Sequence, residues 1–130
     1  MQISRAQRDE LFAHAREDAP NECCGYLRLD GDGRVEEVFR AENTYAAPTR
    51  FMLDDKSLFA ANQLDDDGHG VAIYHSHPRS SPEPSQTDIN IAAYPHWLYL
   101  IVSLAEDELV VRAWRIADGR IDEEEILVTD

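Results

Sequence analysis

The hydrophobic and polar positions at the start of the chain predict a helix followed by a hairpin. Ser4 and Gln7 fit an N-terminal capping box, and the apolar stripe behind them predicts a helix over residues 5–18. An apolar run over 24–29 indicates a strand, and the Asp-Gly-Asp-Gly segment after it is typical of a tight turn. We therefore expect residues 34–41 to return as the second strand of a hairpin.

The rest of the chain alternates between helical and strand patterns with short connections. Asp54 or Asp55 is placed to cap a helix that ends near residue 64. A β-branched apolar run over 71–77 predicts a buried strand. Shorter patterns predict a strand at 50–52, a helix at 85–93, a strand at 97–103 and a closing hairpin of 109–116 with 121–128.

Length and composition indicate one domain of a cytoplasmic protein. We expect residues 1–130 to form a single α/β (α+β) domain, a mixed central sheet flanked by helices, because 130 residues suffice for one core. No run of about 18 apolar residues is present, so no segment is predicted to span a membrane. The charged N-terminus lacks the apolar stretch of a signal peptide. The adjacent Cys23 and Cys24 cannot easily reach disulfide geometry, which agrees with a reducing compartment.

The charge balance is strongly acidic, with 26 Asp and Glu against 12 Lys and Arg and a formal net charge of −14. Such a surface repels phosphates, so no nucleic-acid partner is expected. The same acid excess with a single lysine is what a protein adapted to high salt would carry, because salt screens the self-repulsion. An ordinary acidic cytosolic protein fits the composition equally well.

The segment from His75 to Asp88 contains a set of metal-binding residue types. His75 and His77 stand two positions apart on a predicted strand, so their side chains point to the same face. Two imidazoles and the Asp88 carboxylate are a ligand set suited to zinc, and three protein ligands leave one coordination position for water. The sequence therefore predicts a catalytic zinc site.

A zinc hydrolase also needs a carboxylate that takes a proton from water. Glu22 stands at a helix-to-strand boundary beside Cys23, where a strand edge could aim it at the site. Glu83 lies in a loop between two prolines and is the weaker candidate. Ser85 can cap the helix that carries Asp88, or its hydroxyl can donate to the oxyanion of an attacked carbonyl, and the two roles are compatible.

Other polar and aromatic residues are expected to be structural. Cys23 and Cys24 are expected in the core or in a strand. Tyr74 alternates with the two histidines along its strand and should point into the fold. Surface or loop positions outside the chemistry are expected for His14, His69 and His96. Core packing is expected for Phe59, Trp97, Tyr99 and Trp114.

Glu22, the HSHP segment at 75–78, Ser85 and Asp88 together resemble the JAMM motif of the MPN+ (Mov34/MPN/PAD-1) zinc metalloproteases. The family pattern is Glu, then His-Ser/Thr-His-Pro, six residues, Ser, two residues and Asp, and every specified position is present. The ECCGYL segment around Glu22 also resembles the small stand-alone prokaryotic members. The resemblance spans nearly the whole chain.

The resemblance implies a cytidine-deaminase-like architecture and a role for each residue. It implies that His75, His77 and Asp88 bind zinc, that Glu22 is the general acid/base and that Ser85 stabilises the oxyanion. The implied activity is that of a metallopeptidase (isopeptidase) acting after the C-terminal Gly-Gly of a ubiquitin-like or sulfur-carrier protein. The chain is near the minimal size of the family core, so linkage-specific cleavage of ubiquitin chains is not expected.

Two other classes are alternatives. A zinc nucleobase deaminase would share the fold, but it needs H-x-E followed by P-C-x-x-C, and the chain has neither. A non-catalytic MPN-type zinc-binding or scaffold module is the second alternative. Such modules typically lose ligands, and here all are present. Zinc content and cleavage of a Gly-Gly-extended substrate would separate the scaffold from the enzyme.

Overall fold

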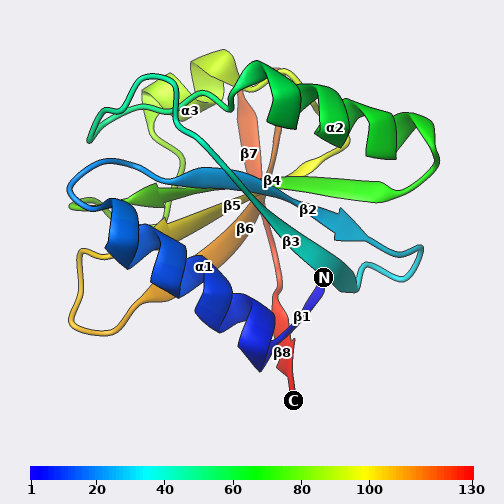
Figure 1. Cartoon of the computed structure of the whole chain (residues 1–130), viewed down its shortest axis with the longest axis horizontal. Helices are drawn as coiled ribbons and strands as arrows, with labels where there is room; N and C mark the ends of the chain where they lie inside the picture. Colours follow the sequence, from blue (N-terminus) through cyan, green and yellow to red (C-terminus); the bar gives the residue numbers. More distant parts are fainter.

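The computed structural model describes all 130 residues and contains a six-stranded sheet with helices on both faces (Figure 1). The chain begins with β1 (Gln2–Ser4), α1 (Arg5–Asp18), β2 (Cys24–Leu29), β3 (Val35–Ala41) and α2 (Asp55–Asp66). It continues with β4 (Gly70–His77), α3 (Gln86–Ile91), β5 (Leu98–Ser103), β6 (Val110–Ala117), β7 (Arg120–Glu124) and β8 (Leu127–Thr129). None of the helices has the length and hydropathy needed to cross a membrane.

The large sheet is mixed and has the strand order β3-β2-β4-β5-β6-β7. Its strands pair antiparallel except for β4 and β5, which run parallel. Parallel neighbours need a crossover, and the segment that contains α3 supplies it. The short strands β1 and β8 pair in parallel and bring the two ends of the chain together (Figure 1). The predicted mixed sheet flanked by helices is confirmed.

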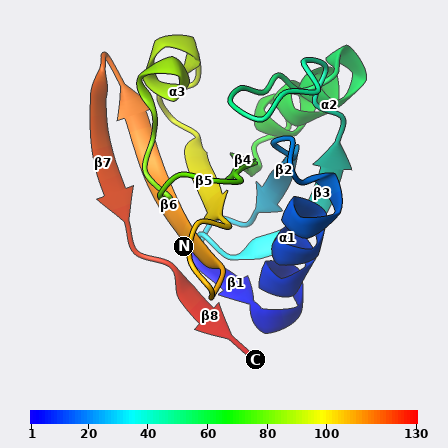
Figure 2. The ribbon, with the colours of Figure 1, turned by 90° about the vertical axis from the view of Figure 1, so that its left-hand side faces the viewer.

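Two hydrophobic clusters cover opposite faces of this sheet. Leu11 and Ala15 of α1 pack on one face with Tyr74 of β4. The other face, under α2 and α3, buries Ile73 of β4 in a second cluster. Figure 2 shows α2 and α3 over this second face as separate elements. Because side chains alternate along β4, Tyr74 points into the fold opposite to the histidines, as predicted, and packs against α1. His75 points towards the face of α2 and α3.

The helix starts follow the capping signals in the sequence. The backbone N–H of Gln7 donates to the Ser4 hydroxyl at 3.1 Å, and the Ser4 N–H donates to the Gln7 side chain at 3.0 Å. This is the predicted capping box. Asp54 caps α2 by accepting from the Ser57 N–H at 3.1 Å. The helix extends to Asp66, two residues beyond its predicted end, and Asp67 is its C-cap.

The structure corrects two predicted elements and adds one that was not predicted. Residues 50–52 form no strand, and the only pairing nearby is a single bridge between Asn43 and Leu53. The predicted strand over 121–128 is two strands, because β7 pairs with β6 whereas β8 leaves the sheet to pair with β1. The sequence missed β1, since three residues are too few to show an alternating pattern.

Two side chains lie where they were not expected. His14 is buried rather than at the surface, and its Nδ1 lies 2.6 Å from the Tyr74 hydroxyl. The Tyr74 ring crosses Gly25, where any Cβ would collide with it. Phe59 is 73% exposed, although core packing was predicted. The burial predicted for the remaining aromatic residues and the cysteines is confirmed for Cys23, Cys24, Trp97, Tyr99 and Trp114.

Candidate metal centre and catalytic cleft

The two histidines lie at the C-terminal end of β4, where the strand is buried on both faces. Ser76, between them, points to the opposite face. Its hydroxyl accepts a hydrogen bond from the Cys23 N–H at 2.8 Å, and its own N–H donates to the Cys23 carbonyl at 3.1 Å. These two bonds hold the start of β2 beside the histidines and so bring Glu22 next to them.

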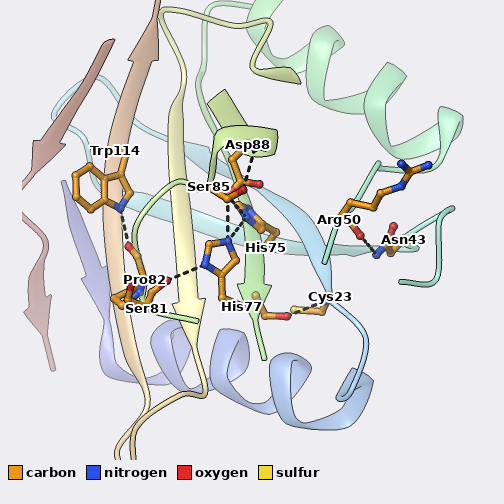
Figure 3. A network of polar contacts seen from close by, with 11 residues as sticks. Cys23, Asn43, Arg50, His75, His77, Ser81, Pro82, Ser85, Asp88 and Trp114 are labelled. Atoms are coloured by element: carbon orange, nitrogen blue, oxygen red, sulfur yellow. Dashed lines mark hydrogen bonds and ion pairs between the residues drawn. The ribbon is translucent and has the colours of Figure 1, made fainter. Parts of the chain in front are cut away.

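Three side chains converge on one point in this region (Figure 3). Nε2 of His75 and Nε2 of His77 are 3.1 Å apart, and Oδ2 of Asp88 lies 3.2 Å and 3.0 Å from them. All three residues are at most 5% exposed. Their ligand atoms lie within 4.8 Å of one another, so the cluster could hold a metal ion.

The hydrogen bonds of the two rings test whether a metal ion fits. Nδ1 of His77 donates to the Ser81 carbonyl at 2.8 Å, so the neutral ring presents a lone pair at Nε2. Nδ1 of His75 is buried without a partner, and the ring instead stacks on Phe51 with its centroid 4.2 Å away. Two nitrogens and a carboxylate oxygen facing one point are the donor set that a cation satisfies. The residues present therefore fit a metal with an open coordination position.

The electrostatics of the ligands agree with this fit. Burial pushes the pKa of Asp88 up, but hydrogen bonds from His75 and His77 outweigh it and hold that pKa well below its usual range. Burial lowers the pKa of His75. Burial also acts against a charged His77, yet its bonds with Asp88 and the Ser81 carbonyl raise its pKa overall. The ionised carboxylate attracts positive charge to this point, whether a proton on His77 or a metal ion.

Glu22 lies beside the ligands and is 4% exposed. Its Oε1 has no hydrogen-bond partner. Burial raises the pKa of Glu22 to about 8, with His77 opposing the shift and Asp88 adding to it. A buried carboxyl group with a pKa near neutrality is suited to take up and return a proton.

The backbone of Glu22 is held from both sides by the segment 43–53. Its N–H donates to the Ala47 carbonyl at 2.8 Å, and its carbonyl accepts from Nδ2 of Asn43 at 3.0 Å. The same Nδ2 donates to the Arg50 carbonyl (Figure 3), and Oδ1 of Asn43 accepts from two backbone N–H groups of the segment. Asn43 thus uses its whole hydrogen-bonding capacity to fix this segment against Glu22.

Ser85 is the N-cap of α3 and forms a reciprocal pair with Asp88. The Asp88 N–H donates to the Ser85 hydroxyl at 3.1 Å, and the Ser85 N–H donates to Oδ2 of Asp88 at 3.0 Å. The predicted capping role of Ser85 is confirmed. The same cap orients the carboxylate towards the histidines, because one oxygen accepts from the backbone and faces both rings.

The loop 78–84 between β4 and α3 is tied to the sheet by three hydrogen bonds to its carbonyls. His77 binds the Ser81 carbonyl, the Ser103 hydroxyl donates to the Ser80 carbonyl at 2.6 Å, and Nε1 of Trp114 donates to the Pro82 carbonyl at 2.9 Å (Figure 3). Strands β5 and β6 thereby hold the loop that joins the histidines to Asp88.

Two cavities meet at the metal centre. The first is a polar cleft of about 550 Å³, to which Glu22, His77 and Ser85 contribute. The second is a smaller apolar cavity, which His75 and Asp88 help to line. The candidate ligands therefore separate a polar space from an apolar one.

The structure brings together the five residues predicted for the site, whose chemical roles stay predictions. Glu83, the alternative base, is exposed, its Oε1 lies 3.9 Å from Nη1 of Arg112, and it does not line the polar cleft that Glu22 lines. Asn43 and Phe51 were not predicted to belong to the site, yet they contact Glu22 and His75 from the segment 43–53. No spacing or pattern distinguishes these two residues, because their role depends on how a distant loop packs.

Comparison with known proteins agrees with this geometry. The family model of prokaryotic homologs of the JAB domain matches residues 4–117, and the chain belongs to this family. The predicted resemblance to small prokaryotic JAMM/MPN proteins is confirmed, and the chain is a hydrolase of this type.

Two relatives and one solved structure illustrate the likeness. The CysO-cysteine peptidase of Mycobacterium tuberculosis is 36% identical over 124 residues, which cover 92% of this chain and 85% of the relative. The desampylase of Haloferax volcanii is 37% identical over 113 residues, which cover 79% and 80%. The solution structure of a protein from Desulfitobacterium hafniense has a TM-score of 0.84 and 37% identity, and the match covers 99% of this chain and 92% of that one.

Proposed function

We propose that the protein is a zinc-dependent isopeptidase that cleaves the peptide or isopeptide bond after the C-terminal Gly-Gly of a ubiquitin-like or sulfur-carrier protein. The observation that carries this proposal is the buried, unpartnered carboxyl of Glu22 beside the converging ligand atoms of His75, His77 and Asp88. The names of the relatives, a CysO-cysteine peptidase and a desampylase, support this kind of substrate.

The chain's own residues account for the proton transfers. Zinc held by the three ligands would supply a Lewis acid that polarises the carbonyl and lowers the pKa of water. Glu22 takes the proton as the water oxygen attacks the carbonyl carbon, and returns it to the nitrogen as the carbon–nitrogen bond breaks. The Ser85 hydroxyl accepts from the Asp88 N–H, so its own proton is available to donate to the developing oxyanion.

Zinc and a cytoplasmic location are further parts of this proposal. Two imidazoles and one carboxylate favour zinc over magnesium or calcium, which take mainly oxygen ligands. The free thiols of Cys23 and Cys24 support a reducing compartment.

The test is cleavage of a defined adduct. A ubiquitin-like protein is joined through its C-terminal Gly-Gly to the lysine of a peptide and incubated with the zinc-loaded protein, and mass spectrometry identifies the products. We expect a product that ends in Gly-Gly together with the free peptide, and at least about 100-fold slower product formation by the Glu22→Gln variant. A wild-type protein that binds zinc stoichiometrically but leaves every such adduct intact would instead support the non-catalytic scaffold.

A further inference from the structure

An apolar cavity of about 170 Å³ opens beside the metal centre, over the sheet face that α2 and α3 share. Of its 13 lining residues, 11 are hydrophobic. The strands contribute Ile73, Tyr99 and Ile116, and α2 and α3 contribute Leu58 and Ile91 from either side. Figure 2 shows these two helices standing apart over the sheet. The cavity is therefore a space between elements that a side chain from outside can enter.

The rim of this cavity is apolar and faces water. Met52 and Ile91, which line it from the segment 43–53 and from α3, are each 47% exposed. In a chain with a net charge of −14, such a concentration of exposed apolar side chains beside a catalytic centre is typical of a ligand-binding surface.

The proposed role of Glu22 indicates which part of the substrate lies on the side of the metal centre where the apolar cavity opens. Glu22 must lie within hydrogen-bond reach of the nitrogen to which it returns the proton. Glu22 and Ser85 line the polar cleft, whereas His75 and Asp88 line the apolar cavity. The leaving amine therefore departs through the polar cleft, and the acyl part of the substrate extends towards the apolar cavity.

The glycines of the tail cannot fill an apolar cavity, because they have no side chain. An extended chain advances about 3.3 Å per residue, so the residue before Gly-Gly lies roughly 7–10 Å from the scissile carbonyl. The segment 43–53 borders both spaces along this direction, with Thr49 on the polar cleft and Phe51 on the apolar cavity. An extended tail that follows this segment brings its third residue from the cut over the cavity.

We propose that this cavity is a specificity pocket for the aliphatic side chain that directly precedes the Gly-Gly of the substrate tail. The inference rests on the proposed function, because it takes the direction of the substrate from the role of Glu22. It goes beyond that function by naming the residue of the substrate tail that is recognised and the residues of the enzyme that recognise it.

A binding experiment tests the pocket without catalysis. The methyl groups of the protein are labelled with ¹³C, and NMR spectra follow the addition of two hexapeptides that end in Leu-Gly-Gly or Ala-Gly-Gly. We expect saturable shifts at Ile73, Ile91 and Ile116 with the leucine peptide, at least several-fold smaller shifts with the alanine peptide, and none at Leu11 on the opposite face. Absent shifts at millimolar peptide, or equal shifts with both peptides, would overturn the pocket.

A kinetic experiment tests specificity with a variant that fills the cavity. Ala92 lines the cavity and is half-buried, so Ala92→Leu should occupy part of it. For an adduct ending in Leu-Gly-Gly, we expect kcat/KM to fall roughly 10- to 100-fold, mainly through KM, with a much smaller fall for Ala-Gly-Gly. The control Ala6→Leu makes the same change at an exposed position of α1 and should keep the wild-type preference.

The outcomes separate the pocket from the activity on which it rests. Cleavage with equal kcat/KM for both tails in the wild-type protein would overturn the pocket and leave the isopeptidase intact. A preference that follows the leaving group instead of the tail would place the pocket on the other side of the scissile bond and overturn the assignment. Methyl shifts specific to leucine without cleavage of any adduct would retain the pocket and refute the proposed activity.

Discussion

The proposed metal ligands and the proposed catalytic carboxylate of this site are held in different ways. The candidate ligands come from one short stretch, from His75 to Asp88, and that stretch also supplies bonds that orient two of them. The Ser85 cap orients Asp88, and the Ser81 carbonyl orients His77. The geometry of the candidate metal centre is therefore determined largely by residues that are close together in the sequence.

Glu22 depends on residues far from it in the chain. Its backbone is held by Asn43 and Ala47, and its position beside the histidines follows from the bonds between Cys23 and Ser76. Because the two parts are held by different residues, metal binding and proton transfer should be separable by mutation. Changes in the local stretch should remove the metal, whereas changes around Glu22 should leave the metal and remove turnover.

The largest effect is expected from His77→Ala. Loss of one of three protein ligands should abolish stoichiometric zinc and reduce cleavage to background, as measured by elemental analysis and by product formation. His96→Ala is the matched control, because that histidine is exposed and its contact with Asp65 lies away from the site. A His77→Ala protein that keeps its zinc would remove this residue from the ligand set.

The next effect is expected from Glu22→Gln, which removes the proton acceptor and keeps the shape. Turnover should fall by about 10²- to 10⁴-fold while zinc content stays at the wild-type level. Glu83→Gln makes the same change at the exposed alternative carboxylate and should leave turnover unchanged. Loss of turnover in Glu83→Gln with normal turnover in Glu22→Gln would identify Glu83 as the base.

Asn43→Asp should disturb the position of Glu22 while leaving its carboxyl group unchanged. The substitution keeps the shape but removes the donated bonds to the Glu22 and Arg50 carbonyls. We expect kcat to fall roughly 10- to 100-fold with little change in KM or zinc content, because a small displacement of a reacting group is costly. Asn62→Asp, which also removes donated bonds to a backbone carbonyl and a side chain, is the control for lost stability. Equal losses of kcat in both variants would make Asn43 a purely structural residue.

A smaller effect is expected from Trp114→Phe, which releases the Pro82 carbonyl. We expect zinc affinity to weaken by less than about tenfold, because Trp114 acts on the ligands only through the loop 78–84. Trp97→Phe is the matched control, since the Trp97 Nε1 is buried without a partner and ties no loop. Unchanged zinc affinity in Trp114→Phe would show that His77 needs no support from β6.

The smallest effect is expected from the buried His14 on the opposite face of the sheet. Burial lowers the pKa of His14 below its ordinary value of 6.5, with Asp18 opposing and Arg40 adding to the shift. As the pH falls through the unfolded-state pKa, the unfolded chain takes up this proton first, so stability is lost from there down to the folded-state pKa. Urea unfolding at several pH values should show a shallower loss for His14→Gln than for the wild type. Parallel curves would mean that His14 titrates alike in both states.

Much of the fold could be predicted from local patterns. The capping box at Ser4, the apolar run of β4 and the turn before β3 each specify their structure within a few residues. The pairing of β1 with β8 could not be predicted, because both are short and the partners lie at opposite ends of the chain. The burial of His14 also depends on a distant partner, the Tyr74 hydroxyl.

In the candidate site too, the residues fixed by local sequence could be predicted and those that depend on distant segments could not. The spacing of His75, His77, Ser85 and Asp88 predicted a cluster that the structure assembles, because a strand, a loop and a helix cap fix it locally. Glu22 was placed near the cluster from its strand boundary and from the family resemblance. Asn43 and Phe51 were missed, since a loop without a regular pattern carries them to the site.

The most direct test of the account is X-ray absorption spectroscopy at the zinc edge of the zinc-loaded wild-type protein. We expect a first shell of nitrogen and oxygen atoms at about 2.0–2.1 Å from zinc, with the multiple scattering of two imidazoles. The same spectrum of Asp88→Asn should show an altered shell or lost zinc. A sulfur shell at about 2.3 Å, which Cys24 beside His75 could supply, or a single imidazole would contradict the ligand set.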